Sequence, residues 1–253
     1  MSKKPTIAVS AVQGAFIEHE KRLASLGCEV FELRQATDLE RPFDALVLPG
    51  GESTVQAKLL RELNMFGTMR ARIVEGMPVL GTCAGLILLA ERIEDGDGDL
   101  AGLDPEIAAV RTRVTGFGTL PVTVRRNGYG RQLGSFHAHA PFTAEGAAPR
   151  RAHDEAATQL PCHLERPNFA EPREATAAFA IGMEPNAKAA PTVPMTFIRA
   201  PFITEVRADA GAKALAEVDG RIVAAQAGNQ IGVAFHPELD EDNTVYQAFL
   251  ALI

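Results

Sequence analysis

Three features are scarce in this sequence of 253 residues: cysteines, long apolar runs and an excess of positive charge. There are only three cysteines, an odd and small number that argues against a disulfide framework and for a reducing compartment. No stretch reaches the roughly 18 uninterrupted apolar residues of a membrane span. The apolar run near the N-terminus is broken by Gln13, Gly14 and Glu18, which is unlike a signal peptide. We therefore expect a cytoplasmic protein that does not enter a membrane.

The charge balance narrows the range of partners further. A net charge of −7 disfavours binding to nucleic acid or to an anionic membrane surface. The length fits one α/β domain, or one domain with a large insertion, and is sufficient to bury a core.

The first part of the chain alternates between short apolar strands and helices. The predicted strands are Thr6–Val12, Glu29–Leu33, Ala45–Leu48 and Pro78–Gly81, and the predicted helices are Phe16–Leu26, Val55–Leu63, Phe66–Glu75 and Ala84–Arg92. Such alternation is typical of crossover units and a parallel sheet. We expect a three-layer α/β sandwich with a mainly parallel central sheet, whose ligands bind at the carboxyl ends of the strands.

Strands dominate after Gly96. The predicted strands are Pro121–Arg125, Gln132–Ala138, Met195–Ile198, Ala214–Val218, Arg221–Gln226 and Ile231–Phe235, and a last helix is predicted over Asn243–Ile253. Asp219-Gly220 lies between two of these strands and indicates a hairpin.

The segment Pro141–Pro194 differs from the rest of the chain in composition. It holds eight of the sixteen prolines and few aliphatic residues, so it buries too little apolar surface to offset its ordering entropy. We interpret residues 1–253 as a single domain with a low-complexity, partly flexible insertion at about 141–194. Cys162-His163 and the nearby His153 do not make a full ligand set, so no metal site is expected there.

The segment Val79–Leu86 carries the pattern Gly-x-Cys-x-Gly where a predicted strand meets a predicted helix. This is the cysteine form of a nucleophile elbow, in which the glycines allow a sharp turn and the Cys83 sulfur lies above the strand end. The helix N-terminus favours a thiolate there, and the amide N–H of Ala84 can donate to a developing oxyanion. The alternative is a small core cysteine, which this strand–glycine–helix context disfavours.

A base for the Cys83 thiol is available in His236-Pro237-Glu238, which follows the predicted strand Ile231–Phe235. Residues two apart in an extended chain point the same way, so Glu238 can hold the far nitrogen of His236 and fix its tautomer. His236 would take the proton from Cys83 and later give it to leaving ammonia. The alternative is a surface loop with solvated side chains.

Gly50-Gly51 directly follows the predicted strand Ala45–Leu48 and Pro49. Two glycines expose backbone N–H groups that can serve as oxyanion donors or as a phosphate nest. Glu52 and Ser53 can also cap the following helix, with Ser53 as the N-cap, and both interpretations can hold together.

These motifs resemble those of a known family. Gly-Thr-Cys-Ala-Gly with a late His-Pro-Glu resembles the class I, triad-type glutamine amidotransferases. Within them, Leu-Pro-Gly-Gly-Glu-Ser-Thr, Cys-Ala-Gly-Leu, Tyr-Gly-Arg-Gln and Phe-Ile-Arg-Ala-Pro are similar to the glutaminase subunits of pyridoxal 5′-phosphate synthases. The resemblance covers Thr6 to about Ala140 and Met195 to the C-terminus. It is interrupted at Pro141–Pro194, where family members are usually much shorter.

The resemblance implies a catalytic triad and a glutamine site. Cys83, His236 and Glu238 would hydrolyse L-glutamine to glutamate and ammonia, with an oxyanion hole at Gly51 and Ala84. The implied glutamine-binding residues are Gly51, Glu52, Ser53, Arg131, Ile198 and Arg199. The α-ammonium group suits Glu52, and the α-carboxylate suits an arginine, whose guanidinium can bind it bidentately. Gln13 matches a family position near the oxyanion loop and the partner interface, although it can also be a polar residue that closes a strand.

The resemblance also implies a partner. Free ammonia would be lost to solvent as ammonium, so a synthase subunit would receive it within a large hetero-oligomer and build pyridoxal 5′-phosphate, the product of vitamin B6 biosynthesis. No cofactor or metal is expected on this chain.

Two alternatives remain: an amidotransferase subunit of another pathway, such as histidine biosynthesis, and a non-catalytic regulatory module on the same fold. The complete set of Cys83, His236 and Glu238 argues against the second. His19 is expected on the exposed side of the first helix.

Overall fold

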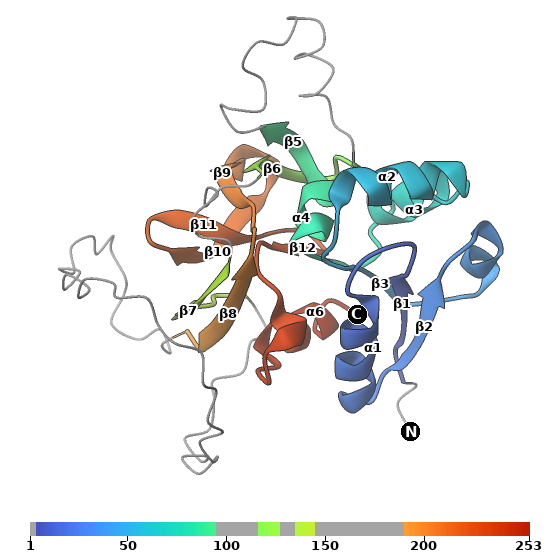
Figure 1. The fold of residues 1–253 in the computed structure, drawn as a ribbon, viewed down its shortest axis with the longest axis horizontal. Helices are drawn as coiled ribbons and strands as arrows, with labels where there is room; N and C mark the ends of the chain where they lie inside the picture. Colours follow the sequence, from blue (N-terminus) through green and yellow to red (C-terminus); the bar gives the residue numbers. More distant parts are fainter. Residues whose placement is uncertain (1–3, 95–115, 127–134, 145–189) are drawn as a thin grey trace, which may run out of the picture. The chain divides into compact units, whose positions relative to one another are not determined.

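The structure is a computed structural model and describes residues 4–94, 116–126, 135–144 and 190–253. Within these residues, a ten-stranded sheet has the order β2-β1-β3-β4-β12-β11-β9-β6-β5, with β10 beside β11 (Figure 1). Its strands are β1 (Thr6–Ser10), β2 (Glu29–Leu33), β3 (Ala45–Leu48), β4 (Val79–Thr82), β5 (Ala90–Glu94), β6 (Leu120–Arg125), β9 (Phe202–Val206), β10 (Ala212–Val218), β11 (Arg221–Ala227) and β12 (Gln230–Val233). A separate hairpin consists of β7 (Ser135–Pro141) and β8 (Thr192–Ile198).

The half of the sheet that carries the predicted elbow is parallel. β1 pairs in parallel with β2 and β3, β3 pairs with β4, and β4 pairs with β12. From β12 onward the neighbours β11, β9 and β6 run antiparallel, and β5 is again parallel to β6. The predicted α/β fold with a mainly parallel central sheet is confirmed.

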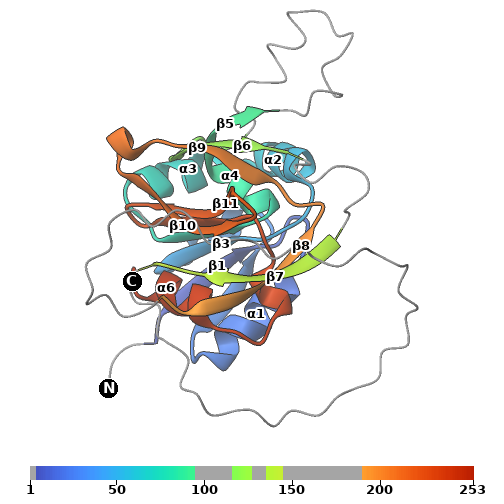
Figure 2. The ribbon, with the colours of Figure 1, turned by 90° about the vertical axis from the view of Figure 1, so that its left-hand side faces the viewer.

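Helices cover both faces of this sheet. α1 (Phe16–Ser25) and α6 (Thr244–Leu250) lie on one face, and α2 (Ser53–Glu62), α3 (Phe66–Val74) and α4 (Ala84–Leu89) lie on the other (Figures 1 and 2). In the part of the chain that the structure describes, three short 3-10 helices lie in connections: η1 (Ala36–Glu40), η2 (Ala208–Ala210) and η3 (Pro237–Leu239). None of the helices in the described part of the chain is long and apolar enough to cross a membrane.

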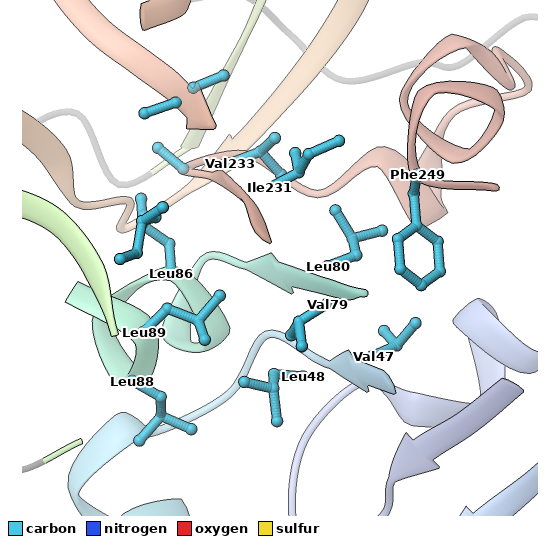
Figure 3. Close-up of a cluster of buried hydrophobic side chains, with 14 of the residues drawn as sticks. Val47, Leu48, Val79, Leu80, Leu86, Leu88, Leu89, Ile231, Val233 and Phe249 are labelled. Atoms are coloured by element: carbon cyan, nitrogen blue, oxygen red, sulfur yellow. The ribbon is translucent and has the colours of Figure 1, made fainter. Parts of the chain in front are cut away.

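Apolar side chains fill the space between the central strands and the helices. Leu48, Leu80, Leu86 and Val233 have no exposed surface, and Phe249 of α6 packs beside Val47 and Leu80 (Figure 3). At about 25 cal/mol per Å² of apolar surface removed from water, such side chains are the main source of the stability of the sheet edge that holds the site.

The boundary after α4 differs from the prediction. Ala84–Arg92 was expected to be one helix, but the helix ends at Leu89 and Ala90–Glu94 forms β5. The carbonyls of Leu88 and Leu89 accept the N–H groups of Phe117 and Thr119, at 2.6 and 2.9 Å. A continuous apolar run fits either structure, and here the strand partner β6 decides.

One strand was not predicted. β9 has the sequence Phe-Ile-Thr-Glu-Val, in which Thr204 and Glu205 interrupt the apolar residues, and it pairs with β6 and β11. The hairpin at Asp219-Gly220 is present as expected, with positive φ at both residues (49° and 72°).

The expected insertion at 141–194 begins and ends within the β7–β8 hairpin. Pro141 pairs with Thr192, and the N–H of Phe142 donates to the carbonyl of Pro191 at 2.9 Å. β8 therefore starts at Thr192, before the expected Met195. Residues 145–189, with Cys162 and the two histidines beside it, lie outside the described residues, so the single-domain interpretation stays a prediction.

Candidate active site

Cys83 lies between β4 and α4 in a sharp turn. Its φ of 48° and ψ of −97° are unusual for a residue with a side chain, and its N–H donates to the carbonyl of Val233 at 2.8 Å. The flanking glycines permit this turn, because a Cβ on Gly85 would lie 2.0 Å from the carbonyl oxygen of Leu48. A Cβ on Gly81 would lie 2.7 Å from the backbone of Gly85. The strand–turn–helix geometry of a nucleophile elbow is therefore present.

His236 and Glu238 meet directly after β12. His236 Nδ1 lies 2.7 Å from Glu238 Oε1, both side chains are nearly buried, and the backbone N–H of His236 donates to Thr196 at 2.8 Å. The contact does not arise from an extended chain, as the sequence argument assumed. Pro237 starts the 3-10 helix η3, which turns Glu238 back toward the imidazole.

The charges of this pair reinforce each other. Burial opposes a charged imidazole, but hydrogen bonds to Cys83 and Glu238, together with the charges of both, raise the pKa of His236 to about 10. Burial likewise opposes a charged Glu238, yet His19 and the hydrogen bond from His236 lower its pKa. At neutral pH the arrangement is a carboxylate beside a protonated imidazole, which in turn contacts the Cys83 sulfur.

The Gly50-Gly51 loop packs against the imidazole. A Cβ on Gly50 would lie 2.4 Å from His236 Cε1, so only glycine fits there. The carbonyl of Gly50 accepts the N–H of Ala15 at 3.0 Å. In a trans peptide the N–H of Gly51 points opposite to that carbonyl, so the bond to Ala15 fixes the direction of this predicted oxyanion donor. Ala84, the other predicted donor, follows Cys83 at the start of α4.

Gln13 connects this loop to the end of β1. Its side-chain Oε1 accepts the N–H of Glu52 at 2.9 Å, and its backbone carbonyl accepts Gln56 Nε2 at 2.9 Å. Gln13 therefore fastens the Gly50-Gly51 loop to the segment after β1, and its role near the oxyanion hole and the partner interface stays a prediction.

Glu52, and not Ser53, caps α2. The carboxylate of Glu52 accepts the N–H groups of Thr54 and Val55, at 3.3 and 2.8 Å, while Ser53 is the first helical residue and is buried. The sequence assigned the cap one residue too late, because a glutamate is a less usual N-cap than a serine. A carboxylate has about four acceptor sites, so capping leaves Glu52 able to bind a cation.

The structure describes only some of the remaining residues that were predicted to bind the substrate glutamine. Ile198 ends β8 and is 40% exposed, and Arg199 follows in a turn with a φ of 42°. Arg131 lies outside the described residues. Arg126, which the sequence analysis did not single out, donates from Nη1 to Thr54 Oγ1 at 3.3 Å and so lies at the start of α2. Its position directly after the predicted strand Pro121–Arg125 could have indicated a residue near the substrate.

The expectation that His19 is exposed was wrong. His19 has no exposed surface and shares the inward stripe of α1 with Leu23, one turn away. Its Nδ1 lies 2.7 Å from the hydroxyl of Tyr246, and its Nε2 lies 3.1 Å from Thr82 Oγ1 and 3.4 Å from Glu238 Oε2. Sequence reasoning missed Tyr246 entirely.

Among the residues that the structure describes, no group of three or more histidine, cysteine or acidic side chains could hold a metal ion. The elbow cysteine, the buried imidazole and the carboxylate have the geometry of a cysteine-triad hydrolase at the carboxyl edge of an α/β sheet.

Comparison with known proteins gives the family. The chain belongs to the SNO glutamine amidotransferase family, which it matches over residues 9–146 and 181–253. It is 42% identical to pyridoxal 5′-phosphate synthase subunit PdxT of Methanocorpusculum labreanum, over 98% of this chain and 97% of that protein. It is 43% identical to the subunit of the same name from Desulfitobacterium hafniense, over 96% and 91%.

A solved structure supports the same assignment. A crystal structure described as a glutamine amidotransferase is 30% identical to this chain, with a TM-score of 0.68 and 97% of both chains covered.

Proposed function

We propose that Cys83, His236 and Glu238 are the catalytic triad of this chain. The chain is a glutaminase of the amidotransferase family that hydrolyses L-glutamine and supplies ammonia within pyridoxal 5′-phosphate synthase. The observation that carries the triad is the position of His236, which contacts Cys83 on one side and Glu238 Oε1, at 2.7 Å, on the other.

The reaction follows from these contacts. The Cys83 sulfur, paired with protonated His236, attacks the side-chain amide carbon of glutamine and forms a tetrahedral oxyanion. His236 donates its proton to the leaving nitrogen, so the C–N bond breaks, ammonia leaves and a thioester remains. His236, now neutral, accepts a proton from water, and the resulting hydroxide adds to the thioester carbonyl. The C–S bond then breaks, glutamate leaves, and the Cys83 sulfur is again paired with protonated His236. Glu238 keeps the Nδ1–H of His236 in place through both steps.

The oxyanion donors would be the N–H groups of Gly51 and Ala84. The carbonyl of Gly50 is bound to Ala15, so reorienting the Gly50–Gly51 peptide requires breaking one backbone hydrogen bond, at a net cost of about 1 kcal/mol. The family resemblance predicts weak glutaminase activity in the isolated chain and a large increase when the synthase subunit docks, and this small cost lets docking reorient the peptide.

Glutamine would bind between the start of α2 and the end of β8. The proposed ligands at the start of α2 are Gly51, Glu52 and Ser53, and those at the end of β8 are Ile198 and Arg199. Arg131 keeps its role as a proposed carboxylate ligand. Arg126 is a second candidate, because its contact with Thr54 puts a guanidinium beside Glu52 and Ser53.

Exposed apolar side chains support a docking face for the synthase. Ile17, Val55, Ile198 and Leu239 are between 40% and 49% exposed. Ile17 and Val55 lie at the starts of α1 and α2, Ile198 at the end of β8 and Leu239 in η3. The elements α1, α2 and η3 all follow parallel strands and so begin at the carboxyl edge of the sheet. Apolar residues gathered near one edge are typical of a protein interface. A cytoplasmic hetero-oligomer, with ammonia passed directly between subunits, is the assembly that we propose.

The test is glutamate release from glutamine by the chain mixed with its synthase subunit. Cys83→Ala should remove the activity and leave the fold intact, whereas Cys28→Ala, at the half-buried cysteine before β2, should leave it unchanged. A glutamine-like alkylating agent should label Cys83 and not Cys28, as read by mass spectrometry. Turnover by Cys83→Ala at the parent rate would refute the proposed triad.

A further inference from the structure

The reaction described above makes no use of His19, which is buried behind the triad. It lies between the hydroxyl of Tyr246, at 2.7 Å from Nδ1, and Glu238 Oε2, at 3.4 Å from Nε2. We propose that His19 is a positioning residue for the glutaminase reaction, which holds the second carboxylate oxygen of Glu238 while Tyr246 fixes the tautomer of His19. The proposal rests on the triad assigned above.

The hydrogen-bond roles in this cluster are set by chemistry. A carboxylate only accepts, so the ring nitrogen of His19 that faces Glu238 has to carry the hydrogen. Nδ1 is then the acceptor, and it takes the O–H of Tyr246. Burial raises the pKa of Tyr246, so its phenol stays protonated and can donate. Tyr246 thus donates to Nδ1 of His19, the Nε2–H of His19 faces Thr82 Oγ1 and Glu238 Oε2, and His236 donates to Glu238 Oε1.

His19 acts in this chain as a neutral group. Burial lowers the pKa of His19. The charge of His236 lowers it further, whereas the charges of Glu238 and Glu18 oppose this shift. A neutral N–H donor orients a carboxylate without neutralising it, so Glu238 keeps the negative charge that supports protonated His236.

The second oxygen of Glu238 needs such a donor. Oε2 is buried and makes no hydrogen bond of standard geometry with the described residues, while Oε1 is taken by His236. At 3.4 Å, His19 Nε2 is within electrostatic contact but longer than an ordinary hydrogen bond. Catalytic hydrogen bonds are often long in the absence of substrate, so this contact is suited to shorten when glutamine binds.

Two further contacts connect α1 to the rest of the triad. His19 Nε2 lies 3.1 Å from the hydroxyl of Thr82, the residue before Cys83. One turn further along α1, Arg22 donates to the carbonyls of Asp240 and Glu241, just beyond η3. The helix therefore touches both chain segments that carry the triad, which is the arrangement required of a supporting element.

The test compares His19→Leu with His19→Gln in the synthase-activated assay. The leucine removes the donor, and we expect kcat to fall on the order of 10-fold or more, with a KM for glutamine within about 2-fold of the parent. The acid limb of the pH profile should move to higher pH, because Glu238 without its donor is easier to protonate. The glutamine keeps an N–H near the position of Nε2 and should restore most of kcat.

A double substitution tests whether His19 acts through Glu238. In a Glu238→Gln background, His19→Leu should lower kcat by less than about 2-fold, since the group that it positions is already absent. Effects that multiply would refute the proposal. If His19→Leu does not fold, Tyr246→Phe, which removes one hydroxyl, should lower kcat several-fold in the same direction, and an unchanged kcat and pH profile would refute it.

Thr119→Val is the matched control. It removes a partly buried hydrogen bond of 2.7 Å to Gln230, at the opposite end of β12 from His236, and should change stability without changing the pH profile. A kcat loss in His19→Leu that follows only the folded fraction, as in this control, would make His19 merely structural. Full activity in Cys83→Ala would instead refute the triad itself, so the two failures are distinguishable.

Discussion

Replacing Gly85 by alanine should destabilise this protein, although the same change usually stabilises a helix. Alanine is favoured over glycine in a helix by at most about 1 kcal/mol. In α4, however, the new Cβ would lie 2.0 Å from the carbonyl oxygen of Leu48. Ordinary carbon–oxygen contacts are about 3.3 Å or longer, so one of the two backbones has to move by about 1.3 Å.

The size of the effect follows from what can move. Leu48 is paired with Gly81 in the sheet, so α4 is the part that yields. Overpacking of this kind costs about 1–3 kcal/mol, and a clash with a paired backbone belongs at the upper end, so we expect a net loss of about 2 kcal/mol. For a domain of this size that corresponds to a Tm lower by roughly 4–8 °C. A shift of α4 also carries Cys83 with it, and a displacement near 1 Å reduces catalysis by on the order of 100-fold.

Urea unfolding and the synthase-activated glutaminase assay measure the two effects. Gly67→Ala is the control, because Gly67 lies in α3, its φ is ordinary and a Cβ there would meet no atom within 4 Å. That variant should be as stable as the parent or more stable by up to about 1 kcal/mol. The reasoning is refuted if Gly85→Ala is equally stable and fully active.

Three further predictions concern charge, substrate and the insertion. Cys83→Ala should lower the pKa of His236 from about 10, as followed by NMR of the imidazole, and an unchanged titration would contradict their contact. Because the folded pKa is raised from 6.5, the stabilisation by protonated His236 is complete below pH 6.5. The unfolding free energy should fall from there to about pH 10, and over a narrower pH range in the variant. Arg126→Ala should raise KM for glutamine about 10-fold, with a smaller change in kcat. The control Arg125→Ala, at a residue that pairs with Glu94, should leave KM unchanged. If Arg126→Ala had the kinetics of the parent, Arg126 would be excluded as a ligand. Replacing residues 145–189 by a short Gly/Ser linker should preserve the fold and leave synthase-activated turnover within a few-fold of the parent, because β7 and β8 already pair beside the replaced segment. A variant that folds but no longer binds the synthase would show instead that the segment is a recognition element.

Features that depend on neighbouring residues were readable from the sequence. The bounds of β2 and β3, the turn at Asp219-Gly220 and the glycine–cysteine–glycine junction agree with the structure. Each of these is a local conformational requirement, such as a positive φ or a run of alternating apolar residues, and the chain meets it without reference to distant segments. His236-Pro237-Glu238 was likewise found because its members are adjacent, although η3 and not an extended strand brings the last of them back.

Features that depend on which surface a segment meets required the tertiary structure. The contact between Cys83 and His236 exists because β4 and β12, far apart in the chain, pair in parallel with Thr82 opposite Val233. His19 reads as an exposed polar residue of α1, but Glu238, Thr82 and Tyr246 surround it and satisfy it inside the protein. Burial of a polar side chain is decided by the partners that neighbouring elements supply, and the periodicity of its own helix carries no record of them.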